Sequence, residues 1–188
     1  QKQKNNINMN KTDSRYELYI NILKEELVPA MGCTEPICIA YAAAKAREVL
    51  GGMPDNVDIL ASGNIIKNVK SVIVPNTNGM KGLKASVAIG VVGGNPEKKL
   101  EVIAGVTEEQ KKEAKKFLET VPMTIAHIDS KEQLDVTIRL HKNEHFASVR
   151  ITNFHTNIVH IQKDNEVLFK SDTIATPSKE LTDRSILS

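Results

Sequence analysis

The sequence contains no tryptophan, and aromatic residues make up only 4% of its 188 residues. This scarcity argues against a nucleic-acid site that stacks bases on aromatic rings. The excess of positive charge is also small, because 25 Lys and Arg against 23 Asp and Glu give a net charge of +2. That charge is too low to indicate a nucleic acid as partner, or an anionic membrane. No apolar run is long enough for a membrane-spanning helix, so we expect no membrane association.

Cysteine is scarce too, with only Cys33 and Cys38 present. They lie five residues apart at a predicted helix start, where a disulfide would conflict with helix geometry. The N-terminal residues 1–8 contain no apolar core of a secretion signal. These features predict a reduced, cytoplasmic protein. We expect residues 1–12 to be a disordered or vector-derived tail and residues 13–188 to form one domain.

The front half of the sequence has the patterns of helices punctuated by glycine and short strands. Ser14 begins a capping box for a helix that should end near Val28. An alanine-rich helix is expected from Thr34 to Leu50, where Gly51 and Gly52 follow as a stop signal. Further expectations are a strand over 57–61, a turn over 75–79, a buried helix over 80–92 and a surface helix over 107–120.

The last third of the chain changes to the alternation of apolar and polar residues that is typical of strands. Short strands are expected over 134–141, 146–151, 157–161 and 167–169, with short turns between them. Such a series favours an antiparallel meander with one covered face. The sequence therefore predicts an α+β fold: a helical front half with short strands, followed by a mostly antiparallel β-meander.

The segment Gly32-Cys33-Thr34-Glu35-Pro36 carries the strongest chemical signal. Thr34 is a good N-cap residue, and glutamate and proline are favoured in a first helical turn. Cys33 is thereby placed against a helix N-terminus, whose free N–H groups and dipole favour a thiolate. Such a thiol can act as a base, a nucleophile or a metal ligand. The alternative is that Cys33 is a small residue in a tight turn.

Two further polar loops stand at the ends of apolar segments, Ser62-Gly63-Asn64 and Asn76-Thr77-Asn78-Gly79. Their hydroxyl, amide and backbone N–H groups suit the carboxylate and amino groups of a small amino acid. His155 lies in a predicted turn from which it could point into a cleft. The alternative is ordinary turn chemistry, since Ser, Asn and Gly dominate turns for conformational reasons. Phosphate-binding and dinucleotide-binding glycine motifs are absent from the sequence, and the cysteine spacing is not that of a zinc site.

Four segments resemble the iron–sulfur L-cysteine desulfidases, relatives of the α-type domain of iron–sulfur L-serine dehydratase. The segments are Val28–Pro36, Ser62–Asn68, Pro75–Gly82 and His155–Ile158, in the order of that family. The resemblance implies a lyase that eliminates hydrogen sulfide from L-cysteine, or water from L-serine, and releases pyruvate and ammonia. It implies that Cys33 removes the α-proton of the substrate. The expected substrate contacts are Thr34, Glu35, Ser62, Gly63, Asn64, Asn76, Thr77, Gly79 and His155.

The resemblance also implies a [4Fe-4S] cluster that acts as a Lewis acid on the substrate. In that family three cysteines of the C-terminal half hold the cluster, and this chain has no equivalent of them. We therefore expect the chain to be the N-terminal portion of a longer or split enzyme, inactive alone. Its partners would be a C-terminal domain that carries the cluster and, in a homo-oligomer, further copies. Two other hypotheses stay open: a non-catalytic module that binds a small amino acid, and an assembly domain.

Overall fold

The computed structural model describes residues 33–171, which belong to one compact unit, Pro29–Ala175. The expected tail over 1–12, the helix over 14–28 and the expected domain end at 188 lie outside the described residues. The helices are α2 (Thr34–Leu50), α3 (Gly63–Val69), α4 (Gly82–Gly93), the 3₁₀ helix η1 (Pro96–Glu101) and α5 (Glu108–Thr120). The strands are β1 (Asn56–Ala61), β2 (Met123–His127), β3 (Asp135–Lys142), β4 (His145–Thr152), β5 (Ile158–Lys163) and β6 (Glu166–Lys170).

The strands form one six-stranded sheet in the order β2-β1-β3-β4-β5-β6. β1 and β2 run parallel, and every other neighbouring pair is antiparallel. The expected meander over the last third is therefore confirmed as β3 to β6, and the fold is α+β. Asn143, Asn153 and Asp164 have positive φ, one in each connection of the meander, a conformation that Asn and Asp tolerate better than most residues.

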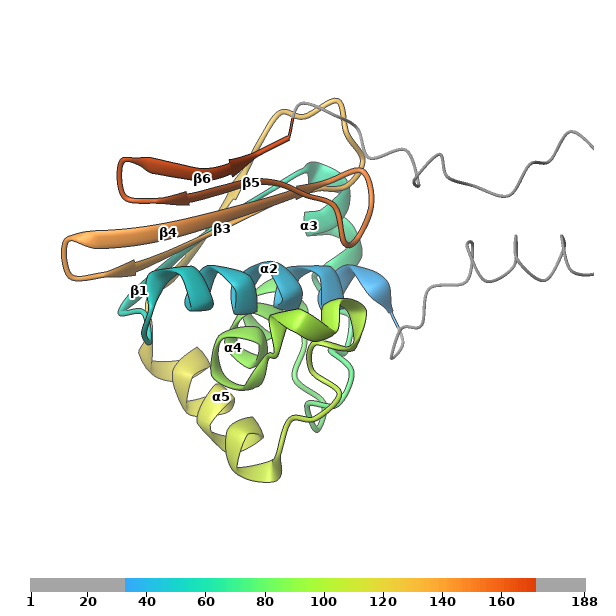
Figure 1. The fold of residues 1–188 in the computed structure, drawn as a ribbon. Helices are drawn as coiled ribbons and strands as arrows, with labels where there is room; N and C mark the ends of the chain where they lie inside the picture. Colours follow the sequence, from blue (N-terminus) through green and yellow to red (C-terminus); the bar gives the residue numbers. More distant parts are fainter. Residues whose placement is uncertain (1–32, 172–188) are drawn as a thin grey trace, which may run out of the picture. The chain divides into compact units, whose positions relative to one another are not determined.

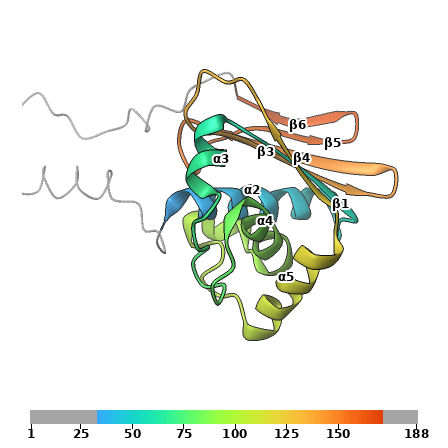
Figure 2. The ribbon, with the colours of Figure 1, turned by 180° about the vertical axis from the view of Figure 1, so that it is seen from behind.

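Helices cover one face of the sheet in layers (Figure 1). α2 lies against β3 and β4, and α4 and then α5 lie on the far side of α2. Alternate residues of β3 and β4 point toward α2 and are fully buried: Val136, Ile138, Leu140, Ala147, Val149 and Ile151. In both views α3 lies near the N-terminal end of α2 (Figure 1 and Figure 2). The start of α2, the short helix α3 and the end of β4 therefore meet at one end of the fold.

The alanines of α2 let α4 approach closely, as the sequence predicts. Ala40 and Ala44 are fully buried on this helix. A Cβ atom at Gly90 of α4 would overlap the backbone of Ala40, and one at Gly94 would lie 2.7 Å from the Cβ of Ala44. Neither glycine can therefore carry a side chain without a shift of one helix.

Several local predictions hold, and others need correction. The surface helix expected over 107–120 is α5, which begins with a capping box between Thr107 and Gln110, and α2 ends at Gly51 with φ 80° as expected. The N-cap of α2 is Cys33 rather than Thr34, which is the first helical residue. η1 and β2 were not expected from the sequence. Among the described helices, none is long and apolar enough to cross a membrane.

Candidate functional site

The start of α2 meets the loop between β4 and β5. Cys33 is exposed and has an extended backbone conformation, and its side chain makes no capping hydrogen bond. The Thr34 hydroxyl oxygen lies 3.2 Å from Nε2 of His155, a hydrogen bond between residues 121 positions apart. The fold thus joins two of the segments that carry the family resemblance.

His155 has the electrostatic setting of a neutral histidine. Burial lowers its pKa below the usual 6.5, and the nearby Glu35 carboxylate opposes this effect only in part. A neutral imidazole has one N–H donor and one acceptor nitrogen. His155 can therefore accept a hydrogen bond from Thr34, or donate one to it, near neutral pH.

The resembling segment Ser62–Asn68 reaches the same place through α3. Asn64 and Asn68 are four residues apart and so share one face of this helix. The Asn68 amide donates a hydrogen bond of 3.1 Å to Glu35. Ser62 is buried as the N-cap of α3, and its hydroxyl donates to the Gln133 carbonyl at 2.8 Å. Ser62 therefore holds the wall of the site, while exposed Gly63 and Asn64 follow it at the surface.

These elements enclose a hollow of about 370 Å³, which we call the His155 hollow. Its volume lies within the roughly 300–1,000 Å³ of small-molecule sites. The lining residues are Glu35, Asn64, Asn68, Lys131, Glu132, Gln133, Leu134, Asn153 and His155. Side chains of both charges and several amides therefore face one small space. Cys33 is next to Thr34 in the chain but is not among the residues that line this hollow.

An ion pair between the buried Asp135 and the half-exposed Arg150 anchors the wall formed by residues 130–134. The Asp135 side chain is fully buried and accepts two hydrogen bonds from Arg150, at 3.0 and 2.7 Å. The same carboxylate accepts a hydrogen bond of 2.7 Å from the Ser130 hydroxyl. The Asn153 N–H donates to the Leu134 carbonyl at 2.9 Å and ties this wall to the loop that carries His155. Asp135 and Arg150 thus position the wall without lining the hollow.

The Asn76 loop does not line the His155 hollow. The Asn76 amide donates to the Ile103 carbonyl at 2.9 Å, and the buried Thr77 hydroxyl donates to the Val74 carbonyl at 2.7 Å. Thr77 and Gly79 instead line a second hollow, against α5. The structure thus brings together Thr34, Glu35, Asn64 and His155 of the expected substrate contacts, and leaves Asn76, Thr77 and Gly79 elsewhere. A larger hollow, of about 490 Å³ beside Arg47 and Pro96, contains none of the expected site residues.

Sequence reasoning missed six of the residues that line the hollow: Asn68, Lys131, Glu132, Gln133, Leu134 and Asn153. Asn68 could have been found from its spacing of four residues from Asn64 on a helix. The loop residues Lys131, Glu132 and Gln133 and the turn residue Asn153 carry no pattern that marks them. The three loop residues reach the hollow because Ser62 holds residues 128–134 beside α3, and Asn153 reaches it from the turn after β4, which is tied to Leu134.

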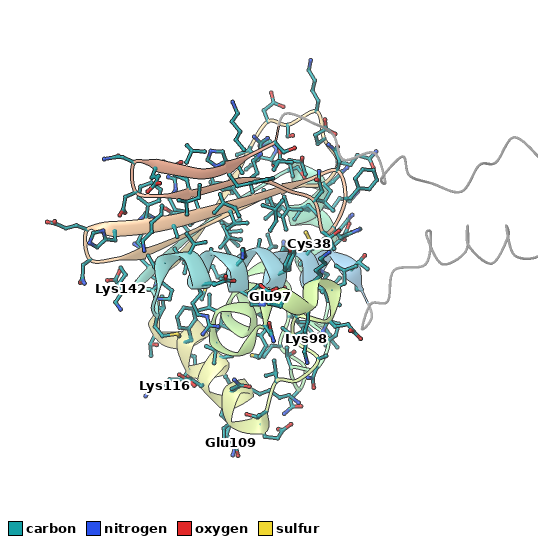
Figure 3. All side chains as sticks on the ribbon, in the orientation of Figure 1. Cys38, Glu97, Lys98, Glu109, Lys116 and Lys142 are labelled. Atoms are coloured by element: carbon teal, nitrogen blue, oxygen red, sulfur yellow. The ribbon has the colours of Figure 1, made fainter. Side chains whose placement is uncertain are left out.

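Neither the cysteines nor the histidines of the described part form a metal site. Cys38 lies on α2 (Figure 3). Its side chain is fully buried, and this burial raises the pKa of its thiol. His141 and His145 each contact an aspartate, Asp58 at 2.8 Å and Asp164 at 2.9 Å. Within residues 33–171, no group of three or more His, Cys, Asp or Glu side chains could hold a metal ion. The residues present therefore do not fit a [4Fe-4S] cluster.

Comparison with known proteins identifies relatives whose sequences align with nearly the whole of this chain. The UPF0597 protein of Desulfitobacterium hafniense is 48% identical over 180 residues, which are 96% of this chain and 42% of that protein. The UPF0597 protein of Treponema denticola is 48% identical over 175 residues, 93% of this chain and 41% of that protein. The chain thus spans about two fifths of the length of these relatives. No family model matches the sequence, and no solved structure gives a significant match.

Proposed function

We propose that this chain is the part of an L-cysteine or L-serine lyase that supplies the α-proton base and much of the substrate site. The observation that carries the proposal is the hydrogen bond between Thr34 and His155. It joins the Gly-Cys-Thr-Glu-Pro segment to the His-Thr-Asn segment at the edge of a polar hollow. These segments resemble a lyase family in sequence, and their meeting at one place supports a shared role.

The His155 hollow has the groups that a zwitterionic amino acid needs. The Lys131 ammonium can bind an α-carboxylate, while Glu35 or Glu132 can bind an α-ammonium group. The amides of Asn64 and Asn68 supply neutral hydrogen bonds. Recognition of both charges on one small ligand would favour free amino acids over amines or carboxylic acids.

Cys33 is the proposed base because of its place at the start of α2. The thiol is exposed at the N-cap position of the helix, next to Thr34, which contacts His155. A thiolate there would accept the α-proton of a substrate whose charged groups are held in the neighbouring hollow. Cys33 would thereby become a thiol, the electron pair of the Cα–H bond would form a Cα=Cβ double bond, and the β-substituent would depart as hydrosulfide or hydroxide. That anion would take a proton from the Cys33 thiol and leave as hydrogen sulfide or water. Water would then hydrolyse the remaining enamine, through its imine, to pyruvate and ammonia.

The implied [4Fe-4S] cluster would have to be held by polypeptide other than this chain. The sequence has two cysteines, and Cys38 is enclosed in the core. When bound, the cluster would supply Lewis-acid chemistry to the substrate. The proposed compartment is the reducing cytoplasm, since both thiols are free.

The test uses the complete gene product, prepared without oxygen. Iron and sulfide content and visible absorption are measured, and pyruvate is assayed with L-cysteine and with L-serine. The proposal predicts an iron-loaded protein that forms pyruvate from at least one of them. An iron-free protein that forms none from either would contradict the lyase assignment.

A second candidate is a module that binds a small amino acid without catalysis. It is favoured by one observation, namely that the Cys33 thiol does not line the His155 hollow. Calorimetric titration with L-serine and L-cysteine distinguishes the two, because the module would bind an amino acid yet leave it unchanged.

A further inference from the structure

The Asn76 loop resembles the lyase family in sequence, yet it lies at a different hollow. This second hollow has a volume of about 390 Å³ and lies between the loop and one side of α5, so we call it the α5 hollow. Its lining residues are Thr77, Asn78, Gly79, Met80, Glu108, Lys111, Lys112 and Lys115. Three lysines therefore face one carboxylate in a space large enough for a small molecule.

A chain of contacts fixes one side of this hollow. The Asn78 amide donates a hydrogen bond of 2.8 Å to Glu108, and the Lys111 ammonium lies 2.7 Å from the same carboxylate. These contacts lower the pKa of Glu108, with the Lys111 hydrogen bond as the largest cause. The Lys111 side chain is only 11% exposed. Glu108 is thus already neutralised by a lysine that is itself held in place.

The other two lysines of the hollow have no such partner. Among residues 33–171, neither Lys112 nor Lys115 lies within ion-pair distance of a carboxylate. The charge that remains in the hollow, after Lys111 and Glu108 cancel, is that of two ammonium groups. This charge matches a ligand with two negative charges.

Three lysines of α5 lie on the side of the helix that lines the hollow, Lys111, Lys112 and Lys115. Together they create a local positive field, which an anion would relieve.

We propose that the α5 hollow binds the phosphate group of a small phosphorylated molecule through Lys112 and Lys115. Lysine is a compact, strongly charged donor that suits phosphate. The volume leaves room for a substituent beyond the phosphate, and the polar atoms of Asn78 lie at the border of the hollow. The site is separate from the His155 hollow, with which it shares no lining residue.

The experiment titrates the full 188-residue chain with inorganic pyrophosphate in a calorimeter at low ionic strength. The double variant Lys112→Gln/Lys115→Gln removes two charges from the hollow. The matched control Lys98→Gln/Lys116→Gln removes the same charge from lysines that do not line it. Figure 3 shows Lys116 and Glu109 at the outer side of α5. Circular dichroism establishes that each variant is folded.

The proposal predicts one binding site whose affinity falls about tenfold or more in the Lys112/Lys115 variant and less than twofold in the control. Inorganic phosphate should compete with pyrophosphate for this site. Absence of binding to the wild-type chain would overturn the proposal. Equal weakening by both double variants would also overturn it, because the lysines would then attract anions only as diffuse surface charge.

Discussion

The hydroxyl of Thr34 lies 3.2 Å from Nε2 of His155, across 121 residues of sequence. α2 supplies the hydroxyl from its first residue, and the loop after β4 supplies the imidazole. Because the next residue, Glu35, binds Asn68 of α3, the contact belongs to a three-way junction beside the His155 hollow. The first residues of α2 thus connect the parts of the site that come from distant segments.

Replacing Thr34 by valine should weaken this junction. Valine keeps the shape of threonine but cannot form the hydrogen bond with the half-buried His155 ring. We expect the free energy of unfolding to fall by about 1 kcal/mol and the His155 ring signals in the NMR spectrum to shift. Thr137→Val is the control, at a partly buried position of β3 on the side of the sheet away from α2. An equal loss in both variants would show that the hydroxyl of Thr34 has no special role.

The lowered pKa of His155 predicts a dependence of stability on pH. Above pH 6.5 the ring is neutral in both the folded and the unfolded chain, so it adds no pH dependence. As the pH falls below 6.5, the unfolded chain takes up the proton first, and the folded state loses stability until the lower folded-state pKa is passed. His155→Gln removes this contribution. Urea unfolding at pH 7.5 and pH 5 should show a smaller loss of stability in the variant, and an unchanged loss would contradict the assignment.

Arg150→Met should strongly destabilise the fold, because it leaves the fully buried Asp135 carboxylate without its cation. The Arg150 side chain is 46% exposed, and Asp135 keeps its hydrogen bond from Ser130, so we expect a cost of about 2 kcal/mol, below that of a fully buried pair. Lys45→Met is the control, since Lys45 pairs with Glu48 near the surface at 3.1 Å and should matter by less than about 1 kcal/mol. Urea unfolding compares the two variants. A similar small effect for both would mean that Asp135 finds other support.

Gly90→Ala should also destabilise, because the added Cβ atom would overlap the Ala40 backbone where α4 crosses α2. Overpacking of this kind typically costs about 1–3 kcal/mol. At Gly105 a Cβ atom would meet only the Lys98 ammonium at 3.8 Å, so Gly105→Ala should be nearly neutral. Thermal unfolding of both variants measures the difference. A stable Gly90→Ala protein would show that the two helices can separate without cost.

The parts of the fold that follow from local physics could be predicted from the sequence. The α2 helix, the capping box at Thr107 and the four strands of the meander each depend on residues close together in the chain. β2 has no comparable signal, because its partner β1 is distant in sequence and four of its five residues are exposed. The β-branched run over 71–74 has the composition of a strand but does not form one. It contributes only a single β-bridge, between Ile73 and Lys81.

The candidate site could be predicted only in part. Thr34, Glu35, Asn64 and His155 belong to recognisable segments, and the fold brings them together. The Asn76 loop carries similar polar side chains in the sequence. In the structure, however, Asn76 and Thr77 donate their hydrogen bonds to the backbone carbonyls of residues 103–104 and of Val74. Residue composition shows which groups are able to bind, whereas only the tertiary structure shows which groups are free to do so.

The most direct test of the account is the effect of Cys33→Ala on the complete protein, prepared without oxygen. Pyruvate formation and amino-acid affinity are measured for this variant and for Cys38→Ala, whose thiol is buried away from the site. The account predicts that Cys33→Ala lowers kcat by about 10²–10⁴-fold while the affinity stays nearly unchanged. Cys38→Ala should retain turnover. Full turnover by the Cys33→Ala protein would contradict the role of Cys33 as the base.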